Sequence, residues 1–122
     1  MKAKKIFQNL HIVREAPLDM DFSKEYFVDP EAWHYLRERG IDVRLISFDK
    51  KRKTWAIYIW VEPEDLEKTI FRVKEFFGFD EVEAEKRIRI IPRFNVRWNP
   101  KTDKSEVYLW GYHLIVIFRN LP

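Results

Sequence analysis

The sequence predicts an α+β fold in which a mostly antiparallel sheet carries two helices on one face. Three observations lead to this class: several β-rich stretches, two stretches with helical spacing of apolar residues, and short polar connections between consecutive strands. The expected order is β-α-β-β-α-β-β, which contains the ferredoxin-like β-α-β-β-α-β arrangement plus an extra C-terminal strand. At 122 residues, 46% of them hydrophobic, the chain is expected to form a single domain over residues 1–122.

The N-terminal part is expected to supply a strand, a connection and a short helix. Residues 5–13 are apolar enough for a first strand, and residues 17–27 are expected to form an irregular connection. Asp29 followed by Pro30 predicts a helix start, because Asp caps a helix and Pro suits its first position. Gly40 can end that helix in a left-handed conformation.

The central part predicts a hairpin and a second helix. Residues 41–48 and 54–61 are rich in β-branched and aromatic side chains, and a short polar tip joins them. An acidic start at residues 62–65 suits a helix dipole. Four apolar residues then recur at i, i+4, i+7 and i+11, which predicts an amphipathic helix ended by Gly78. They are Leu66, Ile70, Val73 and Phe77.

The C-terminal part predicts two strands after a charged segment. Residues 80–86 are expected to form a charged loop or one more helical turn. Strands are expected at 87–98 and 106–119. Pro92 should mark a bulge or a sheet edge, because proline cannot donate to a ladder. Gly111 predicts a bend in the last strand.

Composition excludes several protein classes. The chain has no Cys, which excludes disulfides and thiolate metal sites. It has no apolar run near the ~20 residues that span a bilayer, so we expect a cytoplasmic protein without a membrane partner. Charged residues make up 35% of the chain and Gln occurs once, a bias typical of thermophilic proteins. No Gly-rich phosphate loop is present, and no cofactor is expected.

Charge is distributed unevenly along the chain. Residues 62–86 contain 4 Lys/Arg against 9 Asp/Glu, a net charge of −5. Residues 87–122 contain 7 Lys/Arg against 2 Asp/Glu, a net charge of +5, and residues 1–61 carry +3. A basic block of strand-like sequence indicates a polyanionic partner.

Alternation within the basic block separates two kinds of side chain. Even positions from 88 to 98 are Ile, Ile, Pro, Phe, Val and Trp, whereas four of the six odd positions from 87 to 97 are Arg. Because strand side chains alternate between faces, the apolar set is expected to be core and the arginines to face outward. Two helices can cover only one side of the sheet, so the arginine side is expected to be open.

This open side predicts a nucleic-acid site, with single-stranded DNA or RNA favoured. Bases stack on aromatic rings, and guanidinium groups pair with phosphates. Lys101 and Lys104 in the last turn are expected to help hold the backbone. The predicted site consists of Arg44, Arg87, Arg89, Arg93, Arg97, Tyr58, Trp60, Tyr108, Trp110, Tyr112, Lys50, Lys51, Arg52 and Lys53.

Other interpretations remain open at this point. The same rings and arginines can serve a protein partner or a homodimer, since Trp and Tyr are enriched at interfaces. The arginines can instead form cation–π pairs or ion pairs with the acidic segment 62–86, and the rings can belong to the core. The basic tip, residues 50–53, can simply be a polar loop.

A metal-dependent enzyme acting on nucleotides or nucleic acid is the remaining alternative. Asp19 and Asp21 are two residues apart and would point to one face of a strand, as Mg²⁺ or Mn²⁺ ligands often do. His113 or His11 can complete such a site. We assign no catalytic residue and no metal ligand, and an enzyme is the less expected outcome.

Overall fold

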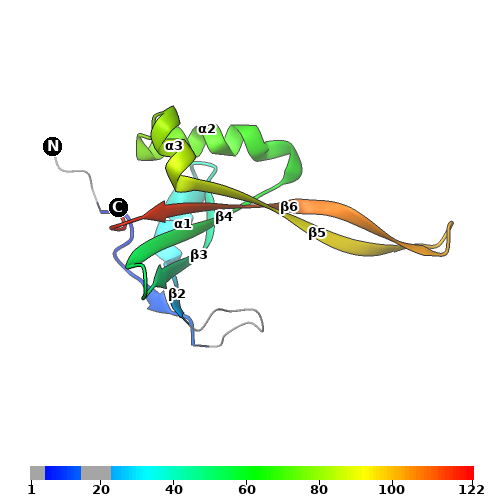
Figure 1. Ribbon diagram of the computed structural model, residues 1–122, viewed down its shortest axis with the longest axis horizontal. Helices are drawn as coiled ribbons and strands as arrows, with labels where there is room; N and C mark the ends of the chain where they lie inside the picture. The colour runs from blue at the N-terminus through cyan, green and yellow to red at the C-terminus, as the bar shows by residue number, and fades with distance from the viewer. Residues whose placement is uncertain (1–4, 15–22) are drawn as a thin grey trace.

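The computed structural model describes residues 5–14 and 23–122. Within these residues the chain has an α+β fold with one open, six-stranded antiparallel sheet and three α-helices (Figure 1). The strand order across the sheet is β1-β2-β3-β4-β6-β5. The elements are β1 (His11–Ile12), β2 (Lys24–Val28), α1 (Pro30–Arg37), β3 (Asp42–Asp49), β4 (Thr54–Val61), a 3₁₀ turn (Pro63–Asp65), α2 (Leu66–Phe77), α3 (Glu81–Arg87), β5 (Ile88–Asn99) and β6 (Lys104–Phe118).

The ferredoxin-like strand order is not confirmed. In that arrangement the strands flanking the first helix are separated by another strand. Here β2 and β3 flank α1 and pair directly with each other, and β6 lies between β4 and β5. The expected first strand at 5–13 is wrong over most of its length, because only His11–Ile12 pairs, with β2. The strand before α1 is β2, which falls largely in the stretch expected to be irregular.

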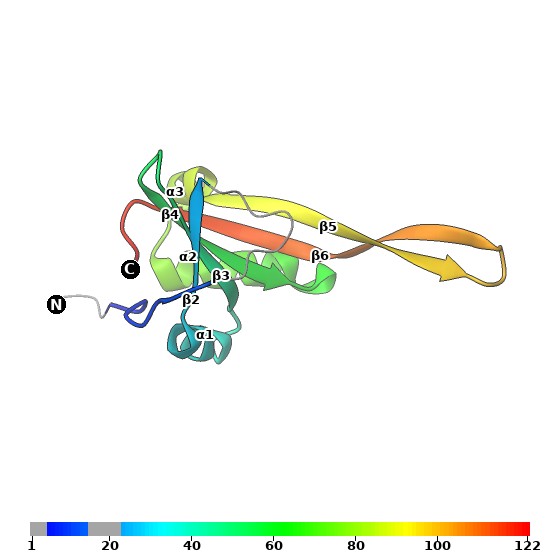
Figure 2. The same cartoon turned by 90° about the horizontal axis from the view of Figure 1, so that it is seen from below.

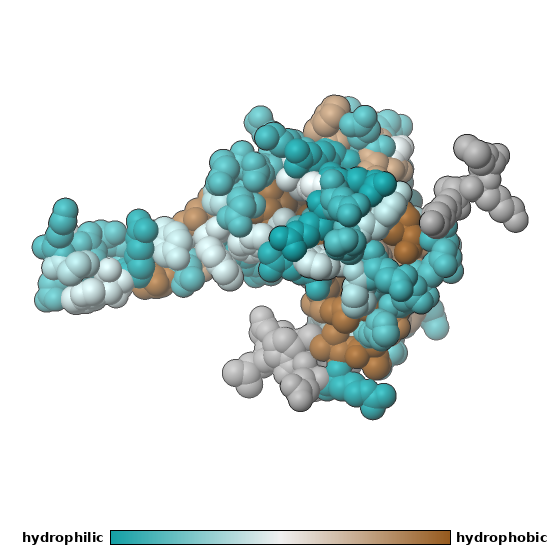
Figure 3. Space-filling model, turned by 180° about the vertical axis from the view of Figure 1, so that it is seen from behind, coloured by the Kyte–Doolittle hydropathy of each residue, from teal (hydrophilic) through white to brown (hydrophobic). Residues whose placement is uncertain are grey.

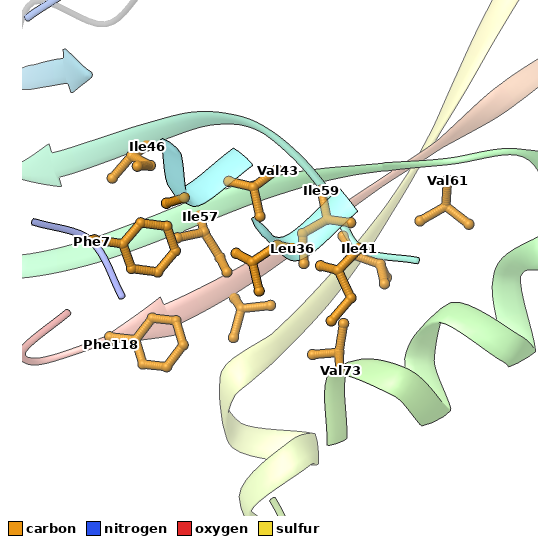
Figure 4. Packing of buried hydrophobic residues seen from close by; sticks show 13 residues of the cluster. Phe7, Leu36, Ile41, Val43, Ile46, Ile57, Ile59, Val61, Val73 and Phe118 are labelled. Carbon is orange, nitrogen blue, oxygen red and sulfur yellow. The ribbon is translucent and has the colours of Figure 1, made fainter. Parts of the chain in front are cut away.

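The hydrophobic core lies between the sheet and its helices (Figure 4). Leu36 of α1 and Val73 of α2 are fully buried against Ile57 and Ile59 of β4. Burying an aliphatic side chain of this size stabilises the fold by about 1.5–3 kcal/mol. Phe7, in the segment before β1, joins the same cluster, so the N-terminal segment contributes to the core without forming a strand there.

The helix ends follow the signals in the sequence. Asp29 caps α1 by accepting a hydrogen bond from the main-chain nitrogen of Ala32. Gly78 ends α2 with a φ of 71°, a left-handed conformation in which glycine avoids a Cβ clash. The charged segment after it is helical: Asp80 caps α3, and its carboxylate accepts a hydrogen bond from the main-chain nitrogen of Glu83.

Strands β5 and β6 extend far beyond the rest of the sheet. Strand β4 pairs with β6 only as far as the Val61–Tyr112 pair, whereas β5 and β6 remain paired from Arg93–Gly111 out to Asn99–Lys104. This two-stranded projection, residues 93–110, is called the arm below (Figures 1 and 2). Every residue of the arm is at least partly exposed to solvent.

Strand β5 meets one expectation from the sequence and departs from another. Pro92 lies on the edge strand of the sheet, as predicted for a residue that cannot donate to a ladder. Most of the even positions, however, are not core: Ile90, Phe94, Val96 and Trp98 are 46%, 62%, 58% and 57% exposed, and Pro92 is exposed as well. Alternation therefore separates the two faces correctly, but the described residues leave the apolar face largely uncovered from Ile90 onward.

Candidate nucleic-acid interface

The side of the sheet opposite the helices carries aromatic rings, and it is called the open face below. Tyr58 and Trp60 alternate along β4 with the buried Ile57 and Ile59, so their rings project away from the core. Figure 2 shows the sheet from this side, with α2 behind it. The prediction that Tyr58 and Trp60 lie outside the core is confirmed.

Four rings meet on the open face where the arm begins. The ring centroid of Trp60 lies 4.8 Å from that of Trp110 and 5.2 Å from that of His113. Tyr58 contacts the other side of His113, with centroids 6.4 Å apart. These four residues are called the ring cluster. Trp110 remains 53% exposed, so the cluster presents aromatic surface to solvent.

A bulge in β6 creates the ring cluster. Arg93 pairs with Gly111 and Phe94 pairs with Leu109, which leaves Trp110 as an extra residue on β6. A Cβ on Gly111 would lie 2.3 Å from atom Cζ2 of Trp60. Glycine at this position thus lets the Trp60 ring lie across the backbone of β6. The bend predicted at Gly111 is confirmed as this irregularity.

Three arginines of β5 lie on the same side as the ring cluster, and none forms an ion pair with a carboxylate of the described residues. Nε of Arg93 donates to Nδ1 of His113 at 2.9 Å. The guanidinium of Arg97 lies 4.9 Å from the ring centroid of Tyr108 on the neighbouring strand. Arg89 donates to main-chain carbonyls at the end of α3. Arg93 and Arg97 are therefore the two arginines of this strand whose guanidinium groups contact only rings, and not carboxylates or main-chain carbonyls, of the described residues.

Arg87 and Tyr112 do not join this group, and their predicted placement is wrong. Arg87 is the last residue of α3, not a strand residue, and it pairs with the carboxylate of Glu83 four residues earlier. Tyr112 pairs with Val61 on the helix side of the sheet and packs against the core. The extra residue at the bulge explains this, because it reverses the alternation that would have placed Tyr112 beside Trp110.

Arg44 contributes positive charge from β3. It lies at a register shift between Val43 and Leu45, and its Nε bonds a carboxylate oxygen of Asp42 at 2.8 Å. The pKa of His113 is lowered from its ordinary value of 6.5, first by burial and then by the nearby charges of Arg93 and Arg44. The two guanidinium groups add positive potential at the ring cluster, which disfavours protonation of the imidazole in the same direction as burial does.

The basic tip, residues 50–53, lies at the other end of the sheet from the arm (Figure 2). The six residues of β4 between the tip and Trp60 correspond to about 20 Å of strand. Lys50 lies 3.7 Å from a carboxylate oxygen of Glu25, and Asp49 accepts from the nitrogens of Lys51 and Arg52. The structure does not bring Lys50, Lys51, Arg52 and Lys53 together with the ring cluster.

The metal-site hypothesis has no test in this structure. Asp19 and Asp21 lie outside the described residues. In the parts of the chain that are described, no group of three His, Cys, Asp or Glu side chains is arranged to hold a metal ion. His11 lies on the short strand β1, and His113 belongs to the ring cluster.

Comparisons with protein-family models, with curated proteins and with solved structures find no match. A helix long and apolar enough to cross a membrane is not found among residues 5–14 and 23–122. What the chain binds must therefore be inferred from its own side chains.

Proposed function

We propose that this protein binds single-stranded nucleic acid on the open face, across the ring cluster and onto the base of the arm. The observation that carries the proposal is the pairing of exposed aromatic rings with arginines that have no carboxylate partner among the described residues. Trp60, Trp110, Arg93 and Arg97 are its central members.

The rings supply stacking surface for unpaired bases. Trp110 is half exposed, and Tyr58 and Trp60 are partly exposed beside it. Stacking of a base on an aromatic side chain contributes about 1–3 kcal/mol and requires little sequence specificity. Bases in a duplex are already stacked and paired, so this surface favours a single strand over a double helix.

The arginines supply phosphate contacts along the same path. Arg93 adjoins the ring cluster, and Arg97 lies four residues farther along the arm, stacked on Tyr108. A guanidinium group can pair with two phosphate oxygens at once, which orients the backbone as well as attracting it. From Tyr58 to Arg97 the path is roughly 20–25 Å of strand, enough for about four nucleotides at the lower end of known site sizes.

Titration of labelled single-stranded DNA, single-stranded RNA and duplex DNA at several salt concentrations tests the proposal. Replacing Arg93 and Arg97 by Ala should weaken single-strand binding and reduce the slope of log affinity against log salt by about 1.4, or 0.7 per phosphate contact. The matched control is Arg37→Ala with Arg39→Ala. Those two arginines also lie over rings, Trp33 and Tyr35, but at the end of α1 and in the turn that follows it.

Two outcomes would contradict the proposal. One is the absence of single-strand binding at low salt. The other is an equal loss of affinity in the control pair, which would indicate attraction by net charge alone. If the open face instead binds a protein or a second copy, Trp110→Ala should dissociate that complex while nucleic-acid affinity stays absent or unchanged.

A further inference from the structure

The helix side of the arm carries a stripe of exposed apolar side chains that the nucleic-acid proposal does not use. Phe94, Val96 and Trp98 of β5 share this side with Val107 of β6, which is 70% exposed. With full areas of about 150–250 Å² for each residue, the four together expose on the order of 500 Å². Figure 3 shows hydrophobic surface on the projecting arm among hydrophilic side chains. A contiguous apolar patch of this size on a protein surface is often functional.

The same side of β5 also borders an apolar groove at the body of the protein. The groove, about 420 Å³ in volume, lies between α2, α3 and β5 and is lined by Ile70, Val82, Ile88 and Ile90. Val82 and Ile90 are 63% and 46% exposed. Glu81 and Glu85 of α3 also line it, as does Lys74, whose Nζ lies 2.9 Å from a carboxylate oxygen of Glu81.

We infer that two copies of this chain form a dimer in which the arm of each copy lies in the groove of the other. Groove and stripe occupy one side of one strand, with Pro92 between them: Ile90 lies two residues before it and Phe94 two residues after it. A two-fold axis that passes near Pro92 therefore places the stripe of each copy against the groove of the other. This surface is self-complementary, as a two-fold interface requires.

Charge favours the same pairing. The arm, residues 93–110, contains 4 Lys/Arg against 2 Asp/Glu, a net charge of +2, whereas the charged residues that line the groove, Lys74, Glu81 and Glu85, carry −1. Opposite net charges attract the two surfaces and disfavour contact between two arms. Phe71, 64% exposed and one turn before the groove residue Lys74, adds apolar surface on the helical side.

The area is sufficient for a stable dimer. Burying both stripes removes on the order of 1,000 Å² from solvent, and the partner surfaces in and around the two grooves add to that area, so the contact can reach the roughly 1,200–2,000 Å² that specific interfaces bury. The open face points away from this contact, so the dimer does not depend on nucleic-acid binding.

Sedimentation equilibrium of the full chain without nucleic acid tests the dimer. Val96→Glu in the stripe and Val82→Lys in the groove should each convert the dimer to a monomer, because the first brings a carboxylate against Glu81 and Glu85 and the second places a charged ammonium group in the apolar contact. Val28→Glu and Val28→Lys are the matched controls, since Val28 is an exposed valine on β2, 36% accessible, and both variants should remain dimeric. A monomeric wild-type chain, or a dimer unchanged by both substitutions, would overturn the inference.

Engineered cysteines distinguish arm-in-groove contact from other dimers, since the natural chain has none. Val96→Cys and Val82→Cys are made as separate variants, mixed, and oxidised. A disulfide between the two variants is expected, and by construction it is intermolecular. Disulfides only between two Val96→Cys chains would show arm-to-arm contact and overturn the inference. Circular dichroism of each variant establishes that it is folded.

Discussion

His113 connects the aromatic and basic parts of the open face. Its Nδ1 accepts the hydrogen bond from Arg93, so the neutral ring carries its proton on Nε2. Both the burial of the ring and the adjacent positive charges favour this neutral form. The neutral imidazole thus contacts the rings of both Tyr58 and Trp60. Protonation of His113 adds a third positive charge beside Arg93 and Arg44.

This arrangement predicts how stability depends on pH. The pKa of His113 in the folded chain lies below 6.5, the ordinary value that it has in the unfolded chain. At pH values between the folded and the unfolded pKa, the unfolded chain therefore binds more protons than the folded chain. The contribution to stability is present above pH ~6.5 and is lost as pH falls through the folded pKa. Arg93→Met should raise the pKa of His113, as measured by NMR titration of its ring protons. Arg39→Met should leave it unchanged, and a fall in the Arg93 variant would contradict the assignment.

Gly111 matters because of the ring that crosses it. Gly111→Ala forces the Trp60 ring away from β6 and should lower the free energy of unfolding by about 1–3 kcal/mol, as overpacking does. Denaturant unfolding followed by tryptophan fluorescence measures this. Trp60→Leu removes the clashing ring atoms, so the double variant should lose less stability than the two single losses added together. If the losses of the two single variants simply add in the double variant, the Trp60 ring is not what restricts position 111 to glycine.

At the scale of elements, α1 is held by its own cap and by the N-terminal segment. Asp29 is only 4% exposed, and its two carboxylate oxygens accept from different elements: one from Ala32 in α1, the other from the nitrogen of Asn9. Asp80 caps α3 with one bond in an exposed position. The two caps look alike in the sequence, but only the first joins distant parts of the chain.

Asp29→Ala should therefore cost more than Asp80→Ala. We expect a loss of about 2 kcal/mol in the free energy of unfolding for Asp29→Ala and about 0.5–1 kcal/mol for Asp80→Ala. Thermal and denaturant unfolding of the two variants provides the comparison. Equal losses would show that the bond to Asn9 contributes nothing to the stability of α1.

For the molecule as a whole, the main division is between a body with a core and an arm without one. The body contains the buried residues of the cluster around Leu36, Ile57 and Leu114, whereas no arm residue is buried. The stability of the body should consequently be independent of the arm. The arm's length is instead explained by the surfaces it presents, apolar on the helix side and basic on the open face.

Removing the arm tests this division. Replacing residues 94–110 by Asn-Gly joins the paired residues Arg93 and Gly111 through a two-residue hairpin turn. The free energy of unfolding should change by less than about 1 kcal/mol relative to the Val96→Glu variant, which serves as reference because both are expected to be monomers. Failure of the shortened chain to fold would show that the arm stabilises the body.

Sequence patterns identified the α+β class, α2, the β3–β4 hairpin and the outward side of β4. They failed where the outcome depends on distant parts of the chain. Alternation along β5 shows that it has two unlike faces, but not whether a core or a partner covers the apolar one. The parity of β6 reverses at the Trp110 bulge, which misplaced Tyr112. Glu83 and Arg87 are four residues apart, a spacing that indicates an ion pair on one face of a helix, so the sequence could have predicted their pairing.

The exposed ladder of the arm has a consequence for backbone amide exchange. Its hydrogen bonds are shielded by no core, so amides of residues 94–109 can exchange with deuterium by local opening, while those of β4 require nearly global unfolding. A second copy seated on the arm would slow that exchange on the arm alone. The kinetics of deuterium uptake thereby report, amide by amide, which part of this molecule is structured by itself and which part by its neighbour.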